Sequence, residues 1–434
     1  MALTNKDYYK IAIPFIISTV TQPLLGAVDT AVIGRLGIAE LIGGVAIGTV
    51  IMNTLYWLFG FFRVSTTGQS AIAMGKNCDE AKASSLLRPF ILSGCVGGLF
   101  ILTQSIIWQG ALWVIEPAAD VAIHAKTYFD ILIFGAPLVL LNYTVIGWLM
   151  GQAKVKEVLF TQVFGNVLNI ILDAIFVLWF DFGVAGVAFA SLIVQATTFA
   201  IGMVLVTRSS NLALTKYLGQ ARMTKADLRT IISSNTDLML RTVCILIFFN
   251  MMARTGSRLG ADVLATNAIL MQVTFIVSYM FDGIANASSV FSGKAVGEKS
   301  PGLLKDVLRL NFQWTTLFVI ILTVFIALFK NDLVFLFTDI PSIISLFEDM
   351  SVWLLLFPFV AGYGLTVYGI FTGTGTTRPV RDSSIVTLLV FLMLSSMSVE
   401  AMGNHGLWLA FTVFYIGRFL FLYPFIFQVK QKCL

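Results

Sequence analysis

Residues 164–180 read FGNVLNIILDAIFVLWF and decide the fold class, because they are almost unbroken hydrocarbon over a length that can cross a bilayer. Three polar side chains interrupt them: Asn166, Asn169 and Asp173. Spacings of three and seven residues place all three on one face of a helix. A carboxylate at the centre of a membrane helix costs about 2.5 to 3.5 kcal/mol on insertion scales. Asp173 is therefore expected to point into protein and to have a function.

The composition of the whole chain matches this stretch. Of 434 residues, 58% are hydrophobic and 12% are charged, against roughly 25% charged residues in soluble proteins. The net charge of +5 comes from Lys and Arg spread over short loops, without the basic stripe of a nucleic-acid partner. Four scattered cysteines predict neither a disulfide framework nor a metal site. The sequence predicts an all-α integral membrane protein.

A requirement of about 20 apolar residues per span predicts twelve transmembrane helices. Their ranges are 8–33, 39–65, 86–110, 125–149, 157–180, 184–207, 233–256, 262–290, 308–329, 349–372, 382–402 and 406–427. Twenty Lys and Arg residues fall in loops on the N-terminal side of the membrane and five on the other side. Both termini are therefore predicted to be cytoplasmic. Three further arginines lie inside predicted spans: Arg63, Arg241 and Arg418.

A long polar segment divides the chain into equal halves. The predicted domains are a first lobe of six helices (1–207), a cytoplasmic linker (208–230) and a second lobe of six helices (231–434). RLG begins a similar stretch in each half, and a small-residue segment with Gly and Lys ends both. Six helices return the chain to its starting side, so the repeats are predicted to be parallel, related by a pseudo-twofold axis along the membrane normal. Two such lobes suit transport by alternating access.

Acidic residues within or near the ends of the spans are the candidates for chemistry. They are Asp29, Asp130, Asp173, Asp237 and Asp282. Asp237 precedes Arg241 by four residues, so the two are predicted to neutralise each other within one helix. Asp130 lies near the outer end of its helix and is expected to be hydrated. Asp29 and Asp173 have no Lys or Arg within four residues on their own helices.

The first predicted helix has a polar stripe of its own, in which Ser18, Gln22 and Asp29 share one face. Two carboxylates in a poorly solvated pocket raise the pKa of at least one of them. Asp29 and Asp173 are therefore predicted to exchange protons and to couple transport to a proton gradient. The alternative is a polar network that only holds helices together.

Pro14 and Pro23 fall in the same helix as Asp29. Each removes a backbone hydrogen bond and favours a kink. A helix that bends as Asp29 gains a proton would couple charge to shape, although proline is also common in membrane helices that do not switch.

The second half carries Met252 and Met393 where the first carries Asp29 and Asp173. A carboxylate that only held helices together would be expected in both repeats. Its absence from the second half therefore favours a coupling role for the first-lobe carboxylates. The second lobe has polar residues of its own, and Asp282 is its ionisable candidate. These second-lobe candidates are Asn267, Gln272, Tyr279, Asp282 and Asn286.

Several segments together carry a family resemblance. They are PLLGAVDTAVIGRLG (23–37), RVSTTGQSAIAMGK (63–76), GNVLNIILDAIF (165–176), GVAGVAFAS (183–191) and GNHGLWLAFTVF (403–414). The chain resembles the multidrug and toxic compound extrusion (MATE) family, in particular its branch of DNA-damage-inducible protein F. The resemblance implies twelve helices in two V-shaped lobes, in a bacterial inner membrane. It implies an antiporter that expels small organic cations in exchange for protons and needs no cofactor, and the protein is expected to act as a monomer.

The resemblance also implies roles for single residues. Asp29 is similar to the family's proton acceptor, and Pro14 to its bending proline. Asn169 and Asp173 are similar to its partners on the fifth helix. The remaining matches are Ser191 on the sixth helix, with Asn142 and Tyr128 on the fourth. Methionine occupies several second-lobe positions at which sodium-coupled relatives carry acids, which favours protons over sodium.

Other functions predict other residues. A sodium-coupled antiporter of the same fold stays open. A lipid-precursor flippase would need a basic cavity for pyrophosphate, whereas the predicted interior carries more acid than base. A membrane-embedded enzyme would need a catalytic set, but His124 and His405 are the only histidines and no HExxH, GxSxG or phosphate loop occurs. A channel would need no carboxylate pair, and ATP-driven transport would need a Walker motif.

Overall fold

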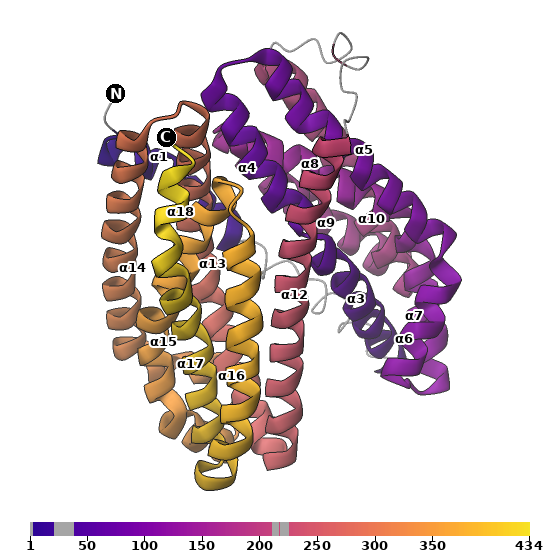
Figure 1. Ribbon diagram of the computed structural model, residues 1–434. Helices are drawn as coiled ribbons and strands as arrows, with labels where there is room; N and C mark the ends of the chain where they lie inside the picture. The colour runs from indigo at the N-terminus through magenta and orange to yellow at the C-terminus, as the bar shows by residue number, and fades with distance from the viewer. Residues whose placement is uncertain (1–2, 21–38, 211–216, 218–224) are drawn as a thin grey trace. The chain divides into compact units, whose positions relative to one another are not determined.

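The computed structural model describes residues 3–20, 39–210, 217 and 225–434, and these contain helices and no β-strand (Figure 1). Eleven helical stretches in the described part are long and apolar enough to cross a membrane. The first predicted span, 8–33, begins as α1 (Asn5–Val20) and continues into residues outside the described part. The predicted all-α membrane class is confirmed.

By their contacts the residues fall into two packed units, here called the N-unit (Val20–Ile232) and the C-unit (Met1–Thr19 with Ser233–Leu434). The helices of the N-unit are α3 (Ala39–Phe59), α4 (Phe61–Lys76), α5 (Asp79–Leu102), α6 (Gln104–Ile115), α7 (Ala119–Leu132), α8 (Ala136–Gly151), α9 (Val155–Asp173) and α10 (Gly183–Ser210). Two short elements join them, the 3-10 helix η1 (Ile133–Gly135) and the π-helix η2 (Ala174–Trp179).

The C-unit contains α1 and the helices that follow the polar segment. They are α12 (Lys225–Leu259), which begins within the N-unit, then α13 (Ala261–Gly297), α14 (Pro301–Phe335), α15 (Pro341–Gly373), α16 (Arg378–Met402), α17 (Asn404–Leu422), η3 (Tyr423–Phe425) and α18 (Ile426–Gln431). The predicted first lobe, 1–207, included the first helix, whereas α1 up to Thr19 belongs to the C-unit.

Several helices are longer than the apolar spans predicted for them. The span 262–290 corresponds to α13, which runs over Ala261–Gly297. Hydropathy windows end where polar residues begin, whereas a backbone helix continues until a residue caps it. At the next helix, α14, the Ser300 hydroxyl provides the cap by accepting from the backbone N–H of Leu303 at 3.3 Å.

The two units repeat the same pattern of helix contacts. In the N-unit, α8 packs on α4, α5 and α10; in the C-unit, α15 packs on α13, α14 and α17. The pair α9 and α10 corresponds to the pair α16 and α17. This correspondence between the packing of the two units is the structural signature of an internal duplication.

Paired glycines lie at a close helix crossing in each unit. A Cβ on Gly147 of α8 would lie 2.5 Å from the carbonyl oxygen of Arg63 on α4. A Cβ on Gly369 of α15 would lie 2.0 Å from the carbonyl oxygen of Ala285 on α13. A second glycine follows four residues later in both, Gly151 and Gly373, and also touches the facing helix. These small-xxx-small pairs let the backbones approach in a way that no larger residue would allow.

Polar contacts attach α1 to the C-unit. Tyr8 is fully buried, and its hydroxyl lies 2.6 Å from that of Ser288 on α13. The Ser288 oxygen also accepts from the amide of Asn311 on α14, at 2.8 Å. At the other end of α1, the Thr19 hydroxyl donates to the carbonyl of Tyr279 at 2.7 Å. The described part of the first helix is thus fixed to α13 at both ends.

Candidate functional site

Three charged residues are buried in the described part of the chain: Asp173, Asp237 and Arg418. Removing a charge from water is costly unless a partner compensates it. Each of these three residues is therefore expected either to be paired with an opposite charge or to have a role in binding.

Asp173 lies at the C-terminal end of α9 and is 0% exposed. Asn169, one turn earlier on the same face, is 2% exposed, while Asn166 is partly exposed. The π-helix η2 begins directly after Asp173. Such departures from α-helical geometry occur frequently at functional sites. The predicted stripe on this helix therefore points inward and ends at a local change of backbone structure.

Helix α10 packs on α7, α8 and α9, and the other predicted N-unit residues lie on these helices and on α10 itself. Ser191 lies on α10 and is partly exposed. Tyr128 on α7 is 5% exposed and its hydroxyl accepts from Thr49 at 3.3 Å. The side-chain oxygen of Asn142 on α8 is buried without a hydrogen-bond partner among the described residues. Together with α9, these helices give the N-unit a polar interior.

Three further residues belong to this interior and were not predicted. Tyr56 on α3 is 8% exposed and interacts electrostatically with Tyr128 and Tyr143, with the side chain of Gln195 adjacent. Gln195 follows Ser191 by four residues on α10, so both are on one helix face. A polar residue one turn from a predicted site residue, inside an apolar span, was the sequence signal that could have identified Gln195.

Part of the predicted coupling site lies outside the described residues: Gln22, Pro23 and Asp29. Of the same helix, Ser18 is 3% exposed and Pro14 lies within α1, which is helical on both sides of it. The pairing of Asp29 with Asp173 and a bend at Pro14 therefore stay predictions.

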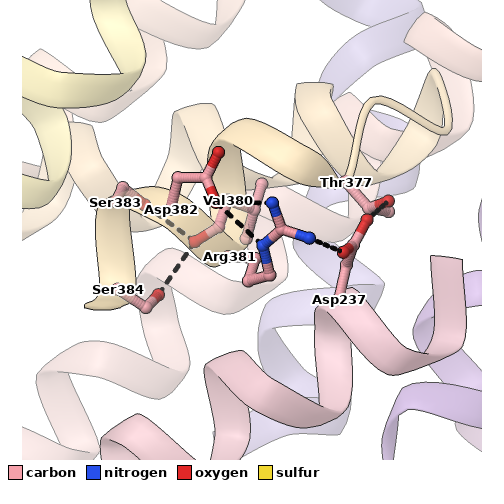
Figure 2. Close-up of polar contacts among 7 residues, drawn as sticks. All are labelled: Asp237, Thr377, Val380, Arg381, Asp382, Ser383 and Ser384. Carbon is pink, nitrogen blue, oxygen red and sulfur yellow. Dashed lines mark hydrogen bonds and ion pairs between the residues drawn. The ribbon is translucent and has the colours of Figure 1, made fainter. Parts of the chain in front are cut away.

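The predicted pairing of Asp237 with Arg241 is wrong. Asp237, 3% exposed, accepts from Arg381 Nη1 at 2.8 Å and from the Thr377 hydroxyl at 2.8 Å (Figure 2). Arg381 also contacts its neighbour Asp382 at 2.7 Å. Because the start of α16 brings a cation and a hydroxyl to this carboxylate, both oxygens of Asp237 are satisfied without Arg241.

Asp130, by contrast, is solvent-exposed as expected. Its carboxylate forms an ion pair with Lys126 at 2.6 Å, and both side chains are about half exposed. An exposed pair of this kind contributes little to stability.

The second-lobe candidates have different environments. Asn267 is 5% exposed; its oxygen accepts from Trp408 at 2.8 Å and from the Asn404 amide at 2.9 Å, and its own amide donates back to Asn404. Asn267 therefore connects α13 to α17. The other four are partly exposed: Gln272, Tyr279, Asp282 and Asn286.

Asp282 interacts electrostatically with Arg418 and Tyr415 of α17. Arg241 lies in the same region and also interacts with Arg418. The sequence predicted an interior with more acid than base, whereas this part of the C-unit contains two arginines and one aspartate. Arg241 had been assigned to Asp237, and an arginine in a span gives no local sign of where its guanidinium lies.

Comparison with known proteins identifies the relatives of this chain. The MatE family model matches residues 14–175 and 238–397. DNA damage-inducible protein F of Escherichia coli K12 is 33% identical over 413 residues, covering 95% of this chain and 89% of the relative. A crystal structure of a MATE protein in the straight conformation superposes with a TM-score of 0.89 at 20% identity, over 98% of this chain and 97% of the other. An outward-facing multidrug resistance MATE transporter also gives 0.89 at 20% identity, over 99% and 96%. At these identities the two structures show the fold alone.

Proposed function

The chain belongs to the MatE family and is a membrane transporter, not an enzyme; from this premise we propose that it exports small organic compounds, mostly cations, in exchange for protons. We further propose that it acts as a monomer in the bacterial inner membrane with both termini in the cytoplasm. No cofactor enters the proposed cycle, in which the proton is the coupling ion.

The observation that carries the proposal is the complete burial of Asp173 beside Asn169, where α9 changes into a π-helix. A buried carboxylate is costly as an anion unless a cation or a proton neutralises it. An organic cation and a proton would therefore compete for the same charge. Binding of one would displace the other, which is the requirement for exchange.

Asp29 completes the proposed site, because two carboxylates that share a poorly solvated region titrate as a coupled pair. The first proton then enters at higher pH than either group alone would accept it. Alternating access would follow if protonation changes the shape of the helix that carries Asp29.

Pro14 is the proposed hinge, and its surroundings give the hinge a physical consequence. It lies between Tyr8 and Thr19, both of which are hydrogen-bonded to α13. A bend at Pro14 would have to alter at least one of these attachments. The hydrogen bond from Thr19 to the Tyr279 carbonyl is the one on the side of Asp29 and would respond first.

Efflux of a fluorescent organic cation, ethidium, from energised cells tests the proposal. Wild type is compared with Asp29→Asn and Asp173→Asn, with and without an uncoupler and with sodium removed. We expect uncoupler-sensitive, sodium-independent efflux in wild type and a fall of about 100-fold or more in each variant, because each loses the group that exchanges charge.

Asp130→Asn is the matched control, since it removes an exposed carboxylate of the same unit. It should export ethidium like wild type. Normal export by Asp173→Asn would show that this carboxylate only joins helices, and would make Asp282 the leading candidate. Efflux that requires sodium and resists the uncoupler would instead favour the sodium-coupled alternative.

A further inference from the structure

The C-unit contains an ionisable centre of opposite charge, around Arg418 on α17. Arg418 is 3% exposed and lies within a candidate membrane span. Its Nε and Nη2 atoms are buried and make no hydrogen bond to any described residue. A guanidinium stays charged in proteins and has five N–H donors. Arg418 is thus a buried cation with donors that lack acceptors.

A second arginine lies near it. The guanidinium carbon of Arg241 on α12 is 4.1 Å from the centre of the Tyr368 ring on α15. The Arg241 Nε is also buried without a hydrogen bond among the residues described. The two arginines repel each other electrostatically. Because Asp237 pairs with Arg381, it does not neutralise Arg241.

The charges around Arg418 do not balance. Arg241, Tyr368, Tyr415 and Asp282 interact with it electrostatically, as does the thiol of Cys244 on α12. Tyrosine is neutral near pH 7. Among the described residues, one carboxylate therefore faces two guanidinium groups, which is an excess of one positive charge. Within a membrane span such a charge needs compensation.

Purely structural cross-linking does not explain this arrangement. The Asp237 site shows what a structural pair looks like in this unit, because both of its carboxylate oxygens accept hydrogen bonds at 2.8 Å. Stacking on Tyr368 contributes attraction for Arg241 but provides no acceptor. The described residues thus provide hydrogen-bond partners for the buried carboxylate of Asp237. They provide none for the Nε and Nη2 donors of Arg418.

We propose that Arg241 and Arg418 bind an oxyanion, a carboxylate or phosphate group carried by an organic amphiphile. Guanidinium groups match the paired oxygens of both anions. Arg241 and Asp282 are partly exposed, so a ligand can reach them, while Arg418, Tyr368 and Tyr415 are buried. The rings offer an apolar surface to the organic part. The oxyanion belongs either to a small organic acid or to the headgroup of an anionic lipid.

Equilibrium dialysis of radiolabelled 4-phenylbutyrate tests this assignment without any ion gradient, so its result is independent of proton coupling. The full-length protein is used in phosphatidylcholine nanodiscs. We expect wild type to bind the acid. Arg241→Gln and Arg418→Gln should each bind it at least about tenfold more weakly, because each loses a charge-assisted contact. Uncharged 4-phenylbutanamide should bind at least about tenfold more weakly than the acid.

Arg254→Gln is the matched control, since Arg254 is an exposed arginine of the same helix, α12. It should bind the acid like wild type. Arg241 is partly exposed, so Arg241→Gln tests the site even if Arg418→Gln fails to fold. Equal affinity of wild type and Arg241→Gln, or equal affinity for acid and amide, would overturn the proposal, as would no binding to wild type.

Nanodiscs that also contain phosphatidylglycerol distinguish the two sources of the oxyanion. Loss of phenylbutyrate binding to wild type in these discs would assign the site to a lipid headgroup. Unchanged binding would assign it to a small organic anion. Either result supports an oxyanion site, provided that Arg241→Gln weakens binding in phosphatidylcholine.

Discussion

In the N-unit the helix pair α9 and α10 buries a carboxylate, Asp173, whereas in the C-unit the corresponding pair α16 and α17 buries a guanidinium, Arg418. Aligning Gly186 with Gly406 in the two sequences makes the contrast specific. Met393 then corresponds to Asp173, and its side chain is 63% exposed. Thr198 corresponds to Arg418, and its hydroxyl donates to the carbonyl of Val194 at 2.8 Å.

The features that do repeat are steric. Both units have the same helix contacts and a pair of glycines at the same crossing, Gly147 with Gly151 and Gly369 with Gly373. A duplicated fold must keep the positions where backbones touch, because any larger residue would separate the helices. It need not keep its ionisable residues, so these mark where each unit has a function of its own.

The largest expected effect comes from substituting the glycines at the helix crossing that both units share. Gly369→Ala places a Cβ 2.0 Å from the Ala285 oxygen, and Gly147→Ala places one 2.5 Å from the Arg63 oxygen. We expect each to lower the free energy of unfolding by about 3 kcal/mol, with Gly369→Ala the more severe. Unfolding by sodium dodecyl sulfate in mixed micelles measures the change.

Gly98→Ala is the control for that series, since Gly98 lies in α5 with no atom within 4 Å of an added Cβ. It should be neutral or slightly stabilising, because alanine favours the helix. If Gly147→Ala were as harmless as Gly98→Ala, the two crossings would not be equivalent.

A smaller effect distinguishes Asp237, which forms an ion pair with Arg381, from Arg241, which forms none with a described residue. Asp237→Asn should lower the free energy of unfolding by about 2 kcal/mol, since it weakens the bond to a partly exposed Arg381. Arg241→Gln should change it by about 1 kcal/mol or less, because it loses one stacking contact and also relieves repulsion with Arg418. The same micelle titration measures both changes. Equal effects of Arg241→Gln and Asp237→Asn would support the originally predicted ion pair between Asp237 and Arg241.

The smallest effect concerns the attachment of α1 to the C-unit. Tyr8→Phe removes the hydroxyl next to Ser288 and should lower the free energy of unfolding by about 1 kcal/mol. It should also speed amide hydrogen exchange in α1. Tyr9→Phe is the control, since Tyr9 makes ring contact with Trp314 and no hydroxyl hydrogen bond to the described residues. Equal exchange rates in the two variants would argue against this attachment.

The sequence was sufficient for what local composition determines. Apolar length predicted the spans, and the polar segment 208–230 lies just before the boundary of the units at Ile232. Helical spacing correctly placed Asn169 and Asp173 on a buried face. Each of these follows from residues within about one or two turns, which a single sequence displays.

Contacts between residues far apart in the chain could not be predicted from the sequence. Asp237 is bound by Arg381, 144 positions away, while the rule for helix neighbours considers only the next turn. The attachment of Tyr8 to Ser288 spans 280 positions, so the grouping of α1 with the C-unit could not be predicted. Arg418 was visible as an arginine within a span, but its lack of acceptors depends on three helices meeting around it.

Proton movement through purified protein tests the central claim most directly. Liposomes that contain the protein and the trapped pH dye pyranine receive an ethidium gradient, and the internal pH is followed. If Asp173 exchanges a proton for the cation, wild type and Asp130→Asn will show an ethidium-driven pH change, and Asp173→Asn will show none. A pH change of equal size in Asp173→Asn, or ethidium transport by wild type without any pH change, would contradict the account.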